Sequence, residues 1–354
     1  MKNTLTSIVG KSLTVLGLAS AVSLNSGCII TFQSPLNLEA RLAEEQPPKH
    51  LSVSRRYDTT AHQFLDLESE LGATDDDYIV LDDVIDKAKE AIRELKLEKP
   101  VADYDNYEAL SVLKAIDKTL KREGFSYKKN LLLNEGLKTK KIDCDNTSMI
   151  YLAIGEELNL PLKMVLAPRH SFIRWHFSDG YFNWETTIGK NVIRNVYVSN
   201  LNISEQAINN GLYLKSLDKK EVLAIQHFNI GTIWLEKNDY EKAAQNFNEA
   251  LILNPKLTPA YNNLGITWYS IDNPEKAIQK YDLAIEFDPN CLEAYANKWI
   301  ALTTLGRFTD ANNVMNKVDK LGINNRPDLR QLIEHLSEDK SILRPVKRDW
   351  PSVL

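Results

Sequence analysis

Apolar positions between residues 81 and 158 follow a helical period in three stretches. Steps of three and four residues predict an amphipathic helix over 81–97 that ends before Pro100, and a second helix that closes near Gly124. A third helix is expected with Cys144 at or just before its start, ending at Pro161 because the residue before a proline disfavours helical geometry. The repeating positions are Leu81, Val84, Ile85, Ala88, Ala91, Ile92 and Leu95 in the first helix and Leu110, Val112, Leu113, Ile116 and Leu120 in the second.

After Pro161 the pattern changes to one typical of strands. Residues 162–167 are predicted to form one strand, and 171–177 with 181–186 a hairpin that turns at Asp179-Gly180. A two-residue turn there pairs Trp175 with Trp184 and makes one face apolar. Together with the helices, this predicts an α+β domain over 76–205. The other face carries His170, Arg174, His176, Tyr181, Asn183 and Glu185.

From about residue 224 the sequence repeats itself every 34 residues. Small residues recur at Ala243, Ala277 and Ala311, and the same spacing relates Pro255 to Pro289. This pattern resembles the tetratricopeptide repeat, in which pairs of helices stack into an all-α solenoid. We expect three repeats and a capping helix over 220–340, with the third repeat degenerate, followed by a tail over 341–354.

Composition narrows the possible functions. The net charge is −5 and no long Lys/Arg cluster occurs, so we expect no nucleic-acid partner. Three cysteines provide neither a disulfide framework nor a paired zinc signature, and neither the six histidines nor the acidic residues are spaced as metal ligands. We therefore predict no cofactor and no metal, and the oligomeric state stays open.

The N-terminus has the features of an export signal. Lys2 and Lys11 flank a short positive region, and the apolar run over 12–24 is too short to span a bilayer. The sequence Leu24-Asn25-Ser26-Gly27-Cys28 resembles a bacterial lipoprotein signal over 1–27. That resemblance implies lipidation of Cys28, a membrane anchor, and an outer-membrane position facing the periplasm. An ordinary signal peptide or an uncleaved anchor remains the alternative, and 28–75 is predicted to be a tether.

Cys144 is the main candidate for chemistry. A helix start favours the thiolate through unpaired N–H groups and the helix dipole, whereas Asp143 and Asp145 oppose it. A second partner is therefore needed, and His170 at a strand start can supply an imidazole that takes the thiol proton. An acceptor behind the histidine would fix which ring nitrogen faces sulfur.

The sequence around these residues resembles the transglutaminase-like, papain-like superfamily, in bacterial proteins that join such a core to tetratricopeptide repeats. The resemblance covers roughly residues 80–200. It implies an α+β transglutaminase-like core, with Cys144 as nucleophile, His170 as general base and Glu185 as the third member. The matching segments are Gly136-Leu137, Ile142-Asp-Cys-Asp-Asn-Thr147, Leu160-Pro-Leu162, Pro168-Arg-His-Ser-Phe-Ile-Arg-Trp175 and Phe182-Asn-Trp-Glu-Thr-Thr-Ile-Gly189.

Simpler interpretations of the same residues stay open. Cys144 could be a buried core residue or form a disulfide with Cys291, and His170 could be a surface residue. The predicted turn pairs Glu185 with Arg174, which allows a salt bridge between them.

On this register, Glu185 lies about four residues, roughly 13 Å, along the strand from His170. A bulge, a longer turn or strand twist is therefore needed to bring the two together. Asn183, on the same face, is the alternative orienting residue.

These features predict an exported Cys–His acyl-transfer enzyme acting on a protein or peptide. It would be either an amide hydrolase, such as a peptidase, or a transglutaminase-type enzyme, with the repeats as a docking surface. The alternative is a catalytically inactive scaffold whose repeats mediate protein–protein contacts.

Overall fold

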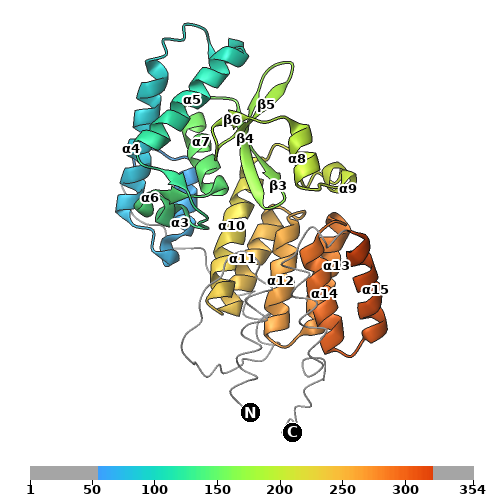
Figure 1. Cartoon of the computed structure of the whole chain (residues 1–354). Helices are drawn as coiled ribbons and strands as arrows, with labels where there is room; N and C mark the ends of the chain where they lie inside the picture. The colour runs from blue at the N-terminus through green and yellow to red at the C-terminus, as the bar shows by residue number, and fades with distance from the viewer. Residues whose placement is uncertain (1–54, 322–354) are drawn as a thin grey trace. The chain divides into compact units, whose positions relative to one another are not determined.

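A computed structural model describes residues 55–321 of the chain (Figure 1). The chain divides into two compact units, which are treated separately below. The N-terminal unit runs to Lys237 and includes Asn248–Leu257, and the C-terminal unit contains Asn238–Phe247 and the residues from Thr258 onward. The predicted signal peptide, Cys28, the capping helix and the tail lie outside the described residues.

Helices form one layer of the N-terminal unit, as the hydrophobic period predicted. The first predicted helix begins six residues earlier than expected, because Thr74 and Asp77 form a capping box and acidic residues fill the first turn. Its buried face packs against the next helix and the helix that starts at Cys144. These helices are α4 (Asp75–Arg93), α5 (Asn106–Arg122), α6 (Leu133–Thr139) and α7 (Cys144–Leu158), with short 3-10 turns at Ser69–Leu71 and Val101–Asp103.

Part of the predicted tether belongs to the folded core. Helix α3 (Thr60–Leu67) buries Ala61, Phe64 and Leu65 and packs against α7. The sequence pattern missed this helix because its eight residues are too few to display a sustained period. The folded unit therefore begins well before residue 76.

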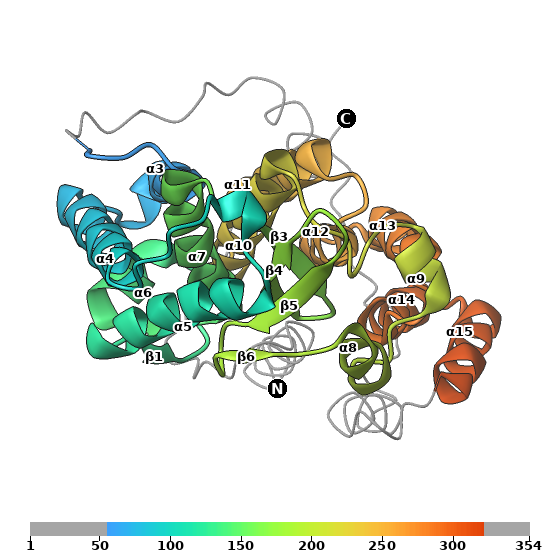
Figure 2. The ribbon, with the colours of Figure 1, turned by 90° about the horizontal axis from the view of Figure 1, so that it is seen from above.

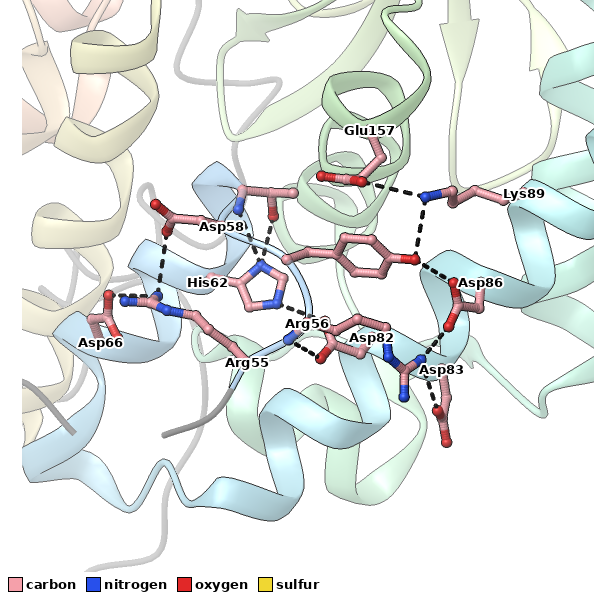
Figure 3. A network of polar contacts seen from close by, with 12 residues as sticks. Arg55, Arg56, Asp58, His62, Asp66, Asp82, Asp83, Asp86, Lys89 and Glu157 are labelled. Carbon is pink, nitrogen blue, oxygen red and sulfur yellow. Dashed lines mark hydrogen bonds and ion pairs between the residues drawn. The ribbon is translucent and has the colours of Figure 1, made fainter. Parts of the chain in front are cut away.

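A polar network fastens the segment before α3 to its neighbours (Figure 3). His62 is fully buried, and its Nδ1 accepts a hydrogen bond from the Thr59 amide at 3.2 Å. Nε2 therefore carries the ring proton and donates it to Asp82 Oδ1 at 3.0 Å, while Asp82 Oδ2 accepts from the Arg56 amide. Lys89 adds an ion pair to Glu157 of α7. The network thus joins the N-terminal segment, α4 and α7.

Four antiparallel strands form the sheet of the N-terminal unit, in the order β3-β4-β5-β6. The strands are β3 (Leu162–Ala167), β4 (His170–His176), β5 (Tyr181–Glu185) and β6 (Lys190–Asn191). A separate parallel pair joins β1 (Ser126–Tyr127) to β2 (Lys141–Ile142).

The hairpin turn differs from the prediction. The loop between β4 and β5 holds four residues, 177–180, and is closed by a bond from the Phe177 amide to the Gly180 carbonyl at 2.8 Å. Trp175 consequently pairs with Phe182, and Arg174 pairs with Asn183. A shift of two residues keeps every side chain on its predicted face, but it changes which side chains are neighbours.

Both faces of the sheet are covered. Trp175 and Trp184 lie on the face that packs against α7, in the core shared with the helices. The opposite face carries Phe172 and is covered by α8 (Arg194–Asn200), α9 (Glu205–Asn209) and residues 212–214. Figure 1 shows α8 and α9 on the other side of the sheet from α4, α5 and α7, and Figure 2 shows the same unit from above. The domain therefore continues past residue 205.

Helical hairpins follow, as the 34-residue repeat predicted. Helix α12 packs on α13 and α14 on α15, and a Cβ at Gly265 would collide with the ring of Tyr281, which explains the glycine in this repeat. The degenerate third repeat still forms a helix pair, with Trp299 buried. The helices are α10 (Lys219–Glu236), α11 (Tyr240–Leu253), α12 (Thr258–Ser270), α13 (Pro274–Phe287), α14 (Leu292–Thr304) and α15 (Phe308–Lys320).

Candidate functional site

Cys144 is the first residue of α7. Its neighbour Asp143 is the N-cap, and Asp143 Oδ1 accepts a hydrogen bond from the Asn146 amide at 3.0 Å. The thiol points towards Asp145, with Sγ 3.8 Å from Oδ1. Asp143 therefore caps the helix, whereas Asp145 contacts the thiol directly.

The surroundings of Cys144 favour the protonated thiol. Only 8% of the residue is exposed, and burial, followed by the charges of Asp145 and Asp143, raises the pKa of the thiol well above its usual value. The neighbouring amide and hydroxyl of Ser171 lower the pKa of the thiol and act in the opposite direction. The helix start is thus outweighed, and a base is required before this sulfur can act as a nucleophile.

His170 and Glu185 lie together on the sheet. His170 Nε2 is 2.6 Å from Glu185 Oε2, which leaves Nδ1 as the ring nitrogen available to another group. Burial raises the pKa of the Glu185 carboxyl, but hydrogen bonding and charge from His170, with further bonds from Thr187, outweigh it and leave the pKa below its usual value. Glu185 is therefore an ionised acceptor behind the imidazole.

The four-residue turn explains this contact. It halves the predicted offset between His170 and Glu185 to two residues, because each β4 residue now pairs two positions earlier on β5. The same register places Arg174 opposite Asn183, and Arg174 Nε donates a hydrogen bond to Asn183 Oδ1 at 2.9 Å. The predicted salt bridge between Arg174 and Glu185 is therefore absent from residues 55–321, and Asn183 orients Arg174, not His170.

Two residues that the sequence did not single out donate hydrogen bonds to the Glu185 carboxylate. Tyr197 of α8 donates its hydroxyl to Glu185 Oε2 at 3.1 Å, and its ring stacks on Phe172 with centroids 4.2 Å apart. Thr187 donates both its hydroxyl, at 2.7 Å, and its amide, at 3.2 Å, to Oε1. Thr187 lies within the Asn-Trp-Glu-Thr-Thr segment and could have been found there, but no local signal marks Tyr197.

Tertiary contacts bring Cys144 and the His170–Glu185 pair into the same part of the unit. Helix α7 packs on β4, and Ser171, which acts on the thiol, directly follows His170. Tyr127 of β1 is exposed, and its hydroxyl lies within electrostatic reach of both Cys144 and Glu185. No hydrogen bond joins the Cys144 thiol to His170 within residues 55–321, so the structure shows a buried thiol and, separately, an imidazole paired with an ionised carboxylate.

The remaining candidates fall outside this arrangement. Neither Cys144 nor Cys291 forms a disulfide in the structure of residues 55–321, which contradicts the disulfide alternative. His176 hydrogen-bonds Ser216 near the far end of β4. Residues 55–321 contain no cluster of three potential metal-ligating side chains, and none of their helices is both long and apolar enough to cross a membrane.

Comparison with known proteins identifies one family match. The tetratricopeptide-repeat family matches residues 224–257, which span most of α10 and α11. No curated protein matches the chain. The chain therefore contains a tetratricopeptide repeat, a structure that commonly mediates protein–protein contacts, within a helical C-terminal region that follows a mixed α+β region.

Proposed function

We propose that the α+β unit is a cysteine-dependent acyl-transfer enzyme acting on an amide of a protein or peptide. The observation that carries this proposal is the 2.6 Å contact between His170 Nε2 and Glu185 Oε2, because it dedicates one ring nitrogen to orientation and leaves Nδ1 for the thiol. The resemblance of the Cys144 and His170 segments to transglutaminase-like proteins supports the same assignment.

The proposed reaction begins with transfer of the Cys144 thiol proton to His170 Nδ1. Sulfur then attacks the amide carbonyl, and His170 returns the proton to the departing amine, which leaves an acyl thioester. Backbone N–H groups at the start of α7 stabilise the oxyanion. Water or a second amine then releases the acyl group, which corresponds to hydrolysis or transamidation respectively.

Thiol reactivity tests this proposal. Iodoacetamide should label Cys144 of the native protein faster than the unfolded chain at pH 7, because His170 supplies a base. Quantitative mass spectrometry of the Cys144 peptide measures the rate, and His170→Ala should slow it at least tenfold, in the range expected for loss of a general base. The matched control is His176→Ala, which changes a second histidine of β4 outside the site. Equal labelling rates in wild type and His170→Ala would contradict the enzyme assignment.

The second candidate is a scaffold whose core no longer reacts. It is favoured by burial of Cys144 and by the neighbouring charge of Asp145, both of which oppose the thiolate. In this function the tetratricopeptide repeats alone carry the activity, by binding a protein partner. A Cys144→Ala strain with unchanged cellular behaviour, in a protein whose Cys144 resists labelling, would favour the scaffold.

We further propose that the protein is exported and anchored to the outer membrane through lipidated Cys28, facing the periplasm. The support is the sequence Leu24-Asn25-Ser26-Gly27-Cys28 after a short apolar run. Growth with radiolabelled palmitate should label the wild type, while Cys28→Ser abolishes the label. Cys291→Ser is the matched control and should retain it. Equal labelling of Cys28→Ser would contradict the anchor.

A further inference from the structure

Arg174 is a buried cation without an acidic partner. Only 4% of the residue is exposed, and it forms no ion pair with any acidic residue of the described chain. Its Nε donates to Asn183, and its Nη1 donates to the Leu214 carbonyl at 3.2 Å and to Ser216 Oγ at 3.3 Å. Nη2 is buried and has no hydrogen-bond partner. Buried guanidinium groups are normally paired, so this one has an unmet requirement for negative charge.

Ionised Glu185 lies two residues beyond Asn183 on β5 and is engaged by His170, and the other charged groups near Arg174 are positive. Lys163 of β3 is paired with Arg174 in the sheet, and the positive charge of Arg194 on α8 repels the guanidinium. His176, two residues along β4, has a pKa lowered by burial and by the charges of Arg174 and Lys163, and the ring of Tyr181 on β5 lies under the guanidinium at 3.9 Å. The site therefore carries an excess of positive charge in a protein whose net charge is −5.

The backbone beside Arg174 is held in an unfavourable conformation. Leu214 has a φ of 60°, in the left-handed region that costs a non-glycine residue roughly 1–2 kcal/mol. In that conformation its amide bonds Leu166 and its carbonyl accepts from Arg174 Nη1. Such local strain is commonly found at ligand sites, where it prearranges groups for binding.

We propose that Arg174 is the centre of a binding site for a small carboxylate anion, which accepts from the unpartnered Nη2. A carboxylate carries one negative charge, matches the single buried guanidinium, and accepts from both N–H groups of Nη2 through its planar oxygens. The site is separate from the His170–Glu185 pair, since Arg174 lies four residues along β4, and it does not depend on the proposed catalysis. A bound anion would offset the charge repulsion between Arg174 and Arg194 of α8.

Calorimetric titration of the full-length protein with sodium acetate tests this site. Sodium chloride at the same ionic strength is the reference for non-specific ion binding. We expect saturable one-to-one binding of acetate and an upward shift of the unfolding temperature that saturates with it. Arg174→Lys should weaken binding at least tenfold, because an ammonium group lacks the planar fork of the guanidinium. Lys114→Met, which removes an exposed charge of α5 on the other side of the sheet, is the matched control and should change affinity less than twofold.

Several outcomes would overturn the assignment. One is the absence of saturable acetate binding to the wild type, and another is equal affinity in a folded Arg174→Lys variant, verified by circular dichroism. Tighter binding of inorganic phosphate would exclude a carboxylate site. Binding of N-acetyl-triglycine but not of its C-terminal amide or of acetate would mean that the site takes the end of a peptide, not a small free acid.

Discussion

The charge on Asp143 influences both the stability of α7 and the reactivity of Cys144. Burial and the neighbouring Asp145 raise the pKa of Asp143 to about 8, even though amide groups at the helix start donate to it. Near neutral pH the residue is therefore largely protonated, and it opposes a thiolate less strongly than an ionised carboxylate would. Raising the pH through 8 ionises it beside a buried sulfur.

This predicts a pH-dependent contribution to stability from Asp143. Because its pKa in the folded protein lies above its value in the unfolded chain, the stabilising contribution is complete at pH 4 and is lost as the pH rises through 8. Asn preserves the N-cap but cannot ionise, so Asp143→Asn should remove this loss. We expect the variant to gain at least about 1 kcal/mol of unfolding free energy relative to wild type between pH 5 and pH 8.5, since one pKa unit corresponds to about 1.4 kcal/mol.

Urea unfolding at the two pH values measures this difference. Asp179→Asn in the exposed hairpin loop is the matched control, and it should leave the pH dependence unchanged. Parallel pH profiles for Asp143→Asn and wild type would show that Asp143 is ionised throughout and would remove this explanation.

Helix α8 both covers one face of the sheet and contributes a residue to the candidate site. It lies on the sheet face opposite α7, and its Tyr197 reaches Glu185 while stacking on Phe172. The helix thereby orients the carboxylate that orients His170. Its role depends on one hydroxyl group, which can be removed without disturbing the ring.

Tyr197→Phe should slow thiol labelling of Cys144 about three- to tenfold while costing roughly 1 kcal/mol of stability, the usual contribution of one hydrogen bond. Loss of a donor raises the pKa of Glu185, so the acid limb of the labelling profile should move to higher pH. Labelling rates between pH 4 and 8 measure both effects. Tyr181→Phe, on β5 and exposed, is the matched control. An unmoved acid limb would mean that Tyr197 is only a packing residue.

The first repeat helix belongs to the α+β unit. Val222 and Ile225 of α10 lie in its core, and Gln226 donates to Glu68. Glu68 in turn accepts from the amides of Leu133 and Asn134, both at 2.7 Å, at the start of α6. The boundary between the repeats and the α+β region therefore does not coincide with the start of the repeat pattern.

Truncation on either side of α10 tests whether this helix stabilises the α+β unit. A chain ending at Leu257 should retain cooperative unfolding of the α+β unit and labelling of Cys144, because every residue of that unit is present. A chain ending at Asp218 lacks α10 and should lose about 5 kcal/mol or more, the sum of two buried aliphatic side chains and a buried hydrogen bond. Circular dichroism during urea unfolding measures both chains. Equal stability would show that α10 contributes nothing to the core.

Local patterns were enough to predict most elements of this protein. Helices α4, α5 and α7, strand β3 and the repeated helix pairs follow from spacing that a few neighbouring residues display. The 34-residue period was equally visible, because each repeat makes the same contacts as the next.

Contacts distant in the sequence decided the rest. A four-residue turn set the register in which Glu185 meets His170 and Asn183 meets Arg174. The short helix α3, Tyr197 on α8 and the unpaired guanidinium of Arg174 also gave no sequence signal. A residue's neighbours across a sheet depend on loop length and burial, which the order of residues along one strand does not contain. Tertiary structure therefore determined which polar residues meet, although their faces had been predicted correctly.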